Sequence, residues 1–172
     1  SARELPAGFY WPRPVPMAWV HISDEESRCG DGFVNTSETE YIDQLIGRLL
    51  RNSAFAAKDI GIITPYVSQK QALERLHSCQ GCTIGSIDAF QGQEKDLIVL
   101  SLVRSNATGS YGFLSEERRM NVALTRCKTA LIVVGNFDFW VGTPTILSYL
   151  AKDFEHRGFV CDEDEWPLAF PR

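Results

Sequence analysis

Two almost continuous apolar stretches constrain the fold of this chain more than any other feature. Residues 97–103 read Leu-Ile-Val-Leu-Ser-Leu-Val, and residues 130–134 read Ala-Leu-Ile-Val-Val. Both have the length of a β-strand, and neither alternates apolar with polar side chains, as a strand with one solvated face does. A strand that is apolar on both sides is typical of the centre of a parallel sheet covered on both faces. The chain is therefore expected to be an α/β protein.

Shorter strands and amphipathic helices alternate with these two stretches. The other expected elements are strands at 17–22, 60–63 and 83–87, helices at 37–50 (N-capped by Ser37), 68–76, 116–125 and 146–154, polar loops at 23–35 and 105–112, and a turn or short helix at 90–95. Such alternation predicts a mainly parallel sheet with helices on both faces. In that architecture ligands gather beyond the carboxyl ends of the strands, and the motifs described below are all expected to follow a strand end.

Composition divides the chain into three parts. Residues 1–16 hold four prolines, which disfavour helix and central strand, so this segment is predicted to be an extended lead-in. Residues 17–160 are predicted to form one domain, because a chain of 172 residues that is 44% hydrophobic can bury a single core. Residues 161–172 are predicted to be an acidic C-terminal tail, either a docking surface or a solvated end.

Charge and hydropathy limit the kinds of partner. The net charge of -5 is not the basic footprint typical of nucleic-acid binding, although several arginines between residues 104 and 128 leave a segregated basic face open. No apolar run approaches the ~18 to 20 residues that a membrane span needs. No signal-peptide pattern opens the sequence. We therefore expect no membrane partner and an intracellular location, nuclear or cytoplasmic.

The five cysteines do not form a disulfide framework, because their number is odd and their spacing is scattered. Cys79 and Cys82 have the CxxC spacing of half a zinc site, of a redox pair, or of a simple polar turn. No second CxxC and no Cys-His pair at ligand spacing accompanies them. The polar turn is the favoured interpretation, and no metal site is predicted.

The sequence contains no phosphate loop of the type Gly-x-x-x-x-Gly-Lys-Ser/Thr. The chain alone therefore lacks the element that cradles phosphates in P-loop enzymes. Ile22 is followed by Ser-Asp-Glu-Glu rather than by a glycine-rich turn. This argues against a small-molecule enzyme of the doubly wound class, which requires such a turn after its first strand.

Two motifs resemble those of a known family. Residues 86–96 read Ser-Ile-Asp-Ala-Phe-Gln-Gly-Gln-Glu-Lys-Asp, and residues 118–126 read Arg-Arg-Met-Asn-Val-Ala-Leu-Thr-Arg. They resemble the last two conserved motifs of superfamily 1 helicases, in the branch that contains the nonsense-mediated-decay helicase. The resemblance covers roughly residues 8–140 and implies the second of two RecA-like motor domains, with a RecA-like P-loop NTPase fold. Two positions, Gln93 and Cys127, depart from the branch pattern.

Two shorter segments extend the resemblance. Gly112, Phe113 and Leu114 match the approach to the second motif. The segment from Asn35 to Glu38 matches an Asn-x-x-Glu signature of the branch, for which capping by Ser37 or a first-turn acid is sufficient explanation.

The resemblance implies a nucleotide site with ATP and Mg²⁺ as cofactors. Arg126 corresponds to the arginine finger, the catalytic residue that stabilises charge on the γ-phosphate. Gln91, Gly92 and Glu94 correspond to nucleotide-contacting residues, where a glycine lets the backbone approach a phosphate closely. Mg²⁺ would be held by the first motor domain. The alternatives are a solvated surface arginine and an ordinary polar turn.

The resemblance also implies a track for single-stranded nucleic acid. Its contact residues correspond to Thr64, Pro65, Tyr66, Ser86 and Asp88. Hydroxyls and backbone amides donate to phosphates, and an aromatic ring packs on sugar or base, so such a track reads shape rather than sequence. RNA and DNA remain equally open as substrates. Otherwise Thr64 and Pro65 end a strand, and Asp88 caps a turn.

The resemblance as a whole implies the C-terminal motor domain of an ATP-dependent helicase that moves five-prime to three-prime, with the first RecA-like domain of the same protein as its partner. The isolated chain is expected to be inactive because it has no phosphate loop. The alternative is a non-catalytic RecA-like module that binds nucleotide, nucleic acid or another protein. An arginine finger argues against that alternative, because a non-catalytic binding module does not need one.

Overall fold

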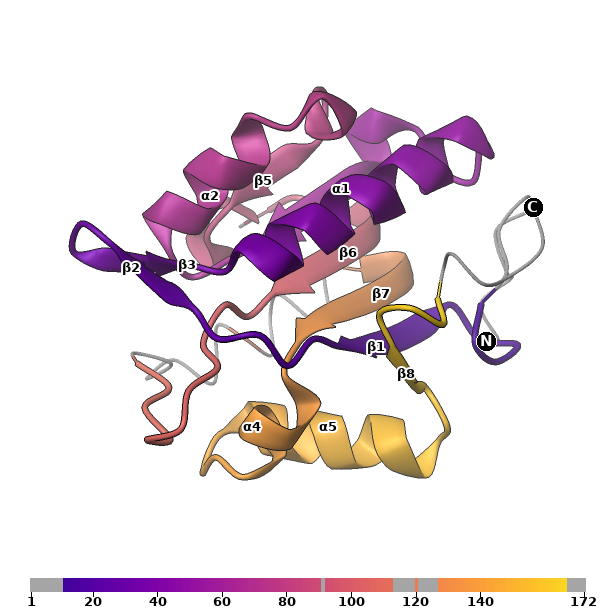
Figure 1. Ribbon diagram of the computed structural model, residues 1–172. Helices are drawn as coiled ribbons and strands as arrows, with labels where there is room; N and C mark the ends of the chain where they lie inside the picture. Colours follow the sequence, from indigo (N-terminus) through magenta and orange to yellow (C-terminus); the bar gives the residue numbers. More distant parts are fainter. Residues whose placement is uncertain (1–10, 91, 113–119, 121–126, 167–172) are drawn as a thin grey trace.

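The computed structural model describes residues 11–90, 92–112, 120 and 127–166. Six parallel strands form one sheet in the order β5-β4-β6-β7-β1-β8 (Figure 1). The strands are β1 (Met17–His21), β4 (Ile60–Ile63), β5 (Thr83–Gly85), β6 (Lys95–Ser101), β7 (Cys127–Gly135) and β8 (Val160–Asp162). The two apolar stretches of the sequence are the central neighbours β6 and β7. The α/β class with a mainly parallel sheet is confirmed.

Helices cover both faces of the sheet (Figure 1). One face carries α1 (Thr36–Arg51) and α2 (Val67–Glu74), and the other carries α4 (Phe137–Val141) and α5 (Ile146–His156). In the described parts of the connections lie three short 3-10 helices: η1 (Ala57–Asp59), η2 (His77–Cys79) and η3 (Ile87–Phe90). None of the helices in the described residues has the length and apolar character to cross a membrane.

The central part of β6 is apolar on both sides because successive residues enter two different cores. Leu97 and Val99 belong to the core beneath α1, whereas Ile98 and Leu100 belong to the core on the α4 and α5 side. All four side chains are at most 1% exposed. A period of two along the strand thus places each of these four side chains in an apolar environment.

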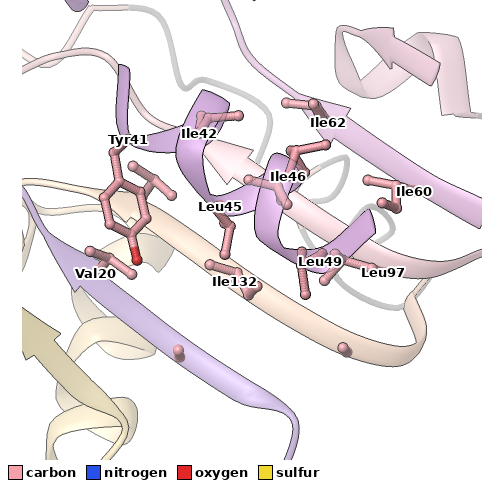
Figure 2. Packing of buried hydrophobic residues seen from close by; sticks show 14 of the residues in the cluster. Val20, Tyr41, Ile42, Leu45, Ile46, Leu49, Ile60, Ile62, Leu97 and Ile132 are labelled. Carbon is pink, nitrogen blue, oxygen red and sulfur yellow. The ribbon is translucent and has the colours of Figure 1, made fainter. Parts of the chain in front are cut away.

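Helix α1 packs across the middle of the sheet through one apolar stripe (Figure 2). The stripe consists of Tyr41, Ile42, Leu45, Ile46 and Leu49. These positions recur every three to four residues, so they share one side of the helix. Full burial of a large apolar side chain contributes roughly 1.5–3 kcal/mol. The stripe therefore anchors α1, and with it the first turn of the helix, firmly to the sheet.

Aromatic packing holds the opposite face. Trp19 from β1 meets Phe137 and Phe154 edge-on, at ring-centroid distances of 5.8 and 6.5 Å. Phe154 in turn meets Phe159 edge-on at 5.5 Å. Such edge-to-face pairs contribute beyond their buried area. They connect α4, α5 and the start of β8 to the centre of the sheet.

The region between β1 and α1 differs from the expected polar loop. It contains an antiparallel hairpin of β2 (Ser27–Cys29) and β3 (Gly32–Val34), which runs beside α2. Its strands are three residues each and carry no alternating apolar pattern, so the sequence held no strand signal there. The expected N-cap of α1 is also wrong: the cap is Asn35, whose side chain accepts a hydrogen bond from the Glu38 amide, rather than Ser37.

The two ends of the described chain meet. The domain boundary expected after residue 160 falls inside β8, which pairs with β1 through Asp162. Trp166 is fully buried, and its ring lies 5.7 Å from that of Trp11 in the expected lead-in. The expected helix at 116–125 lies outside the described residues except for Met120, which is buried.

Candidate functional site

The adjacent strands β5, β4 and β6 bring the predicted nucleic-acid contacts to one edge of the sheet. Ile63, the last residue of β4, is in register with Gly85 of β5 and Leu100 of β6. Thr64, Pro65 and Tyr66 follow β4 directly. The Thr64 amide donates to the Gly85 carbonyl at 3.1 Å, so this segment lies next to the carboxyl end of β5.

The predicted contact residues differ in exposure. Pro65, Ser86 and Asp88 are exposed, and Tyr66 is half-buried. Thr64 is only 1% exposed, and its hydroxyl has no hydrogen-bond partner among the described residues. Buried hydroxyls are usually satisfied, so this one is available to a further donor or acceptor at the edge.

Tyr66 is held by a residue that the sequence analysis did not single out. The guanidinium of Arg104 donates from Nη1 to the Tyr66 hydroxyl at 3.1 Å. It also lies over the ring of Phe33, 4.0 Å from the centroid, and that ring meets the Tyr66 ring edge-on at 5.4 Å. Arg104 thus joins the β2–β3 hairpin to the segment after β4. Its place just beyond the apolar run at 97–103 was the available signal, because such positions lie at the carboxyl edge.

Glu26 completes this cluster from the loop before the hairpin. Its carboxylate accepts from Arg104 Nε at 2.6 Å, from the Ser105 amide at 3.2 Å and from the Asn106 side chain at 2.8 Å. Burial by itself raises the pKa of Glu26, but hydrogen bonds from Asn106, Arg104 and Ser105 outweigh it and lower the pKa below its ordinary value. Glu26 and Arg104 therefore form an ionised pair, with side chains only 6% and 8% exposed.

The predicted nucleotide contacts lie elsewhere, which corrects the expectation that every motif follows a strand end. Gly92 and Glu94 precede β6, which begins at Lys95. Residues 86–90 follow the carboxyl end of β5 and residues 92–94 precede the amino end of β6, so these two parts of the motif lie toward opposite ends of strands that are both parallel to β4. The buried ring of Phe90 secures this crossing. No sequence pattern marks this crossing, because η3 is too short to have a period.

Gly92 has the backbone that a phosphate contact requires. Its φ is +74°, a left-handed conformation that favours glycine, and among the described residues beyond its chain neighbours no atom lies within 4 Å of where a Cβ would stand. Gly92 and Glu94 are exposed. Gln91 and Arg126 lie outside the described residues. Arg126 directly precedes Cys127 in the sequence, and Cys127 is in register with Lys95, the residue after Glu94.

The CxxC pair has the character of ordinary core thiols. Cys79 is buried beneath α1 and Cys82 packs against the same core. Burial raises the pKa of both thiols, that of Cys82 to about 12, so neither is a reactive thiolate near neutral pH. Within the described residues, no group of three or more His, Cys, Asp or Glu side chains is arranged to hold a metal ion.

Comparison with known proteins defines the class. A protein family described as an AAA domain matches residues 3–138, so the chain belongs to that family. The regulator of nonsense transcripts 1 homolog of Drosophila melanogaster is 40% identical over 146 residues, which are 78% of this chain and 12% of that protein. The homolog of Neurospora crassa is 41% identical over 150 residues, 79% of this chain and 14% of that protein.

A third relative carries an enzymatic name. The ATP-dependent helicase NAM7 of Saccharomyces cerevisiae is 39% identical over 166 residues, which are 90% of this chain and 17% of that protein. These relatives confirm the resemblance to the nonsense-transcript branch of superfamily 1 helicases. The chain spans less than a fifth of the length of each of the three relatives.

Proposed function

We propose that this chain is the second RecA-like motor domain of an ATP-dependent superfamily 1 helicase. The observation that carries the proposal is the separation of the two sets of predicted contacts. Thr64 and Tyr66 lie at the carboxyl edge of the sheet, whereas Gly92 and Glu94 lie at the amino end of β6. A motor needs this separation, because nucleotide and strand must bind at different places on one rigid body. The relatives named ATP-dependent helicases support the same function.

In the proposed nucleotide site, Gly92 offers a phosphate its exposed backbone, and Gln91 and Glu94 contribute polar side chains from the same turn. Arg126 supplies the arginine finger from the position before β7. The starts of β6 and β7 are neighbours through Lys95 and Cys127, which supports a shared site for these residues. When ATP binds with Mg²⁺, the phosphate loop and the Mg²⁺ ligands come from the first RecA-like domain.

In the proposed strand site, Ser86 and Asp88 contribute exposed polar groups and Tyr66 contributes a ring fixed by Arg104. Pro65 lies exposed between Tyr66 and Thr64, whose hydroxyl has no hydrogen-bond partner in the described part of the chain. Contacts of this kind suit the backbone and bases of single-stranded RNA or DNA without reading a sequence.

The test uses the two-domain protein, meaning this chain together with the phosphate-loop domain proposed to act with it. ATP turnover would be measured with single-stranded RNA and with single-stranded DNA, for the unchanged protein and for Arg126→Ala. We expect a loss on the order of 10³-fold in turnover with strand binding retained. Arg157→Ala is the matched control, because Arg157 lies on the α5 side and pairs only with Asp153 in the described hydrogen bonds.

Near-normal turnover of the Arg126→Ala protein would reject the arginine-finger assignment. If the two-domain protein binds strands or nucleotide but never hydrolyses ATP, the non-catalytic RecA-like module becomes the better description. The nucleic acid that stimulates turnover more strongly identifies the substrate.

A further inference from the structure

Glu38 lies fully buried in the first turn of α1 and contacts the carboxyl end of β6, more than 60 positions away in sequence. Its carboxyl group accepts a bifurcated hydrogen bond from the Val103 amide, at 3.0 and 3.1 Å to the two oxygens. It also accepts from the Ser101 hydroxyl at 2.8 Å. Both partners belong to the carboxyl end of β6 and the turn that follows it. Glu38 therefore binds the backbone at Val103, the residue before Arg104.

Asn35 binds the carbonyl group of the same residue, Val103. Its side-chain amide donates to the Val103 carbonyl at 3.0 Å and to the Asp24 carbonyl at 3.0 Å. Its side-chain oxygen meanwhile accepts from the Glu38 amide as the N-cap of α1. Asn35 and Glu38 together hold both the amide and the carbonyl of Val103. Capping of α1 uses only one of these bonds, the one from the Glu38 amide to the Asn35 side chain.

Gln69 of α2 closes the network. Its side-chain oxygen accepts from the backbone amide of Asn35 at 3.0 Å, and its side-chain nitrogen donates to the Ser101 hydroxyl at 3.1 Å. Asn35, Glu38, Gln69 and Ser101 are all 0% exposed. A buried polar network that is this well satisfied is rigid and specifies one arrangement of the groups it holds.

The held residue has an unfavourable backbone. Val103 has a φ of +70°, and the Arg104 amide donates across it to the Leu102 carbonyl at 2.8 Å. This is a γ-turn with a left-handed centre, which is rare and strained, and especially unfavourable for a β-branched residue. Such a conformation costs on the order of 1–3 kcal/mol and persists only where its surroundings enforce it. The network of Asn35 and Glu38 supplies that enforcement.

The strained turn sets the direction of the next side chain. Arg104 leaves the turn toward Glu26, Phe33 and Tyr66, and it contacts all three. With Val103 in an ordinary extended conformation, the chain would continue in another direction and the guanidinium would leave this position. The buried network thus fixes the turn at Val103, and the turn fixes the position of Arg104. Arg104 in turn holds the ring of Tyr66 at the candidate strand site.

We propose that Asn35 and Glu38 are positioning residues that hold Val103 in its left-handed turn and thereby fix Arg104 against Tyr66. The effect on strand binding rests on the function proposed above for Tyr66. The placement of Arg104 does not rest on that function, so the two can be tested separately.

The placement of Arg104 is tested by NMR on the 172-residue chain. The Nε–H group of Arg104 donates to Glu26 inside the protein, so it should give a signal in slow exchange with solvent, which Arg104→Lys removes and so assigns. We expect Asn35→Ser to abolish the slow exchange of this signal, because serine keeps the cap but cannot reach the Val103 carbonyl. Glu38→Ala should have the same effect, and Glu38→Gln, which still accepts from the Val103 amide, should retain the signal.

Ser148→Ala is the matched control for general destabilisation. It removes a hydrogen bond to the Val141 carbonyl on the other face of the sheet, and it should leave the Arg104 signal unchanged. An unchanged Arg104 signal in folded Asn35→Ser protein would overturn the proposal. Should Glu38→Ala fail to fold, Asn35→Ser alone decides, because its helix cap is preserved.

Strand binding is then measured in the two-domain protein with a single-stranded oligonucleotide. We expect Asn35→Ser and Tyr66→Ala each to weaken the affinity about tenfold, the loss typical of one stacked base. If Tyr66→Ala weakens binding and Asn35→Ser does not, the positioning proposal fails while the strand site stands. If Asn35→Ser releases Arg104 and neither variant changes affinity, the positioning role stands and the assignment of Tyr66 to the strand site fails.

Discussion

The guanidinium of Arg104 donates a hydrogen bond to the hydroxyl of Tyr66 at 3.1 Å, across 38 positions of sequence. Arg104 follows β6 and Tyr66 follows β4, and these strands are neighbours in the sheet. The same guanidinium is paired with Glu26 and covers the ring of Phe33. A single side chain thus joins three segments at the edge where strand contacts are proposed.

Removal of the Arg104 charge should strongly destabilise the protein. Arg104→Met leaves the nearly buried carboxylate of Glu26 without its cation. We expect the free energy of unfolding to fall by about 3 kcal/mol, as measured by urea titration. The double variant Glu26→Gln with Arg104→Met should recover part of the loss, because no isolated charge remains. Additive losses in the double variant would show that the ion pair has no such role.

Gly112 should tolerate no side chain, because it lies directly against the Arg104–Tyr66 contact. A Cβ at Gly112 would stand 2.4 Å from the Tyr66 hydroxyl and 2.7 Å from Arg104 Nη1. Gly109 is the matched control, since its φ of +73° nearly equals the +69° of Gly112, but no atom of the described part of the chain beyond its direct neighbours lies within 4 Å of its Cβ position.

Both Gly→Ala variants incur the left-handed backbone cost of about 1 kcal/mol. We expect Gly112→Ala to lose a further 1–3 kcal/mol from the clash, roughly as in overpacked cores. Thermal or urea unfolding of the two variants side by side provides the measurement. Equal losses would mean that the Tyr66 side chain simply moves aside.

The stability of the chain should decrease as pH rises, through Glu38. Burial raises the pKa of this carboxyl to about 8, against the lowering effect of its bonds from Val103 and Ser101. A group whose pKa is higher in the folded state stabilises fully below its unfolded pKa, and that contribution is lost as pH rises through the folded value. Between pH 5 and 8, the free energy of unfolding should fall by up to about 1.4 kcal/mol per pH unit.

The Glu38→Gln variant tests the source of this dependence, because glutamine keeps the shape and the acceptor but does not titrate. We expect urea unfolding of the variant to show a much flatter dependence between pH 5 and 8. A slope equal to that of the unchanged chain would assign the effect to another group.

Gly92→Ala should impair nucleotide use with little effect on folding. A methyl group at this exposed position would keep the backbone away from a phosphate. Gly30→Ala, in the hairpin turn, is the control, because Gly30 also has a positive φ and, within the described ranges and apart from its chain neighbours, no atom within 4 Å of its Cβ position. We expect ATP turnover of the two-domain protein at subsaturating ATP to fall about tenfold in Gly92→Ala, a loss of ~1.4 kcal/mol in binding, and to be unchanged in Gly30→Ala. Equal effects of the two substitutions would remove Gly92 from the proposed site.

The isolated chain should not hydrolyse ATP at a measurable rate. Phosphoryl transfer depends on positioning and electrostatic stabilisation, and the phosphate loop that provides much of both is absent from this sequence. Release of inorganic phosphate by the purified chain, with and without single-stranded RNA, provides the measurement. Robust magnesium-dependent release that survives Arg126→Ala would contradict the proposed division of labour between two domains.

The sequence by itself determined the layers of the fold. The apolar runs that became β6 and β7, and the stripe from Tyr41 to Leu49, are local patterns whose period matches a buried strand or a one-sided helix. Burial of apolar area depends on that period alone, so these elements were predictable. The motif resemblance likewise pointed to the family that the comparison confirmed. All of its site assignments stay predictions, those at Thr64, Tyr66 and Gly92 as much as those at Gln91 and Arg126.

Only the tertiary structure decided how the polar groups meet. The contacts of Glu38 with Val103 and of Arg104 with Glu26 span 65 and 78 positions of sequence. Hydrogen bonds are directional and short, so they depend on strand order and on one strained turn, neither of which has a periodic signature. The hairpin, the pairing of β8 and the crossing from β5 to the start of β6 likewise depend on contacts between distant segments, so no local pattern predicts them. Asn35 and Glu38 therefore appear in the sequence only as part of a helix start that Ser37 was expected to cap, whereas in the fold they support a distant side chain.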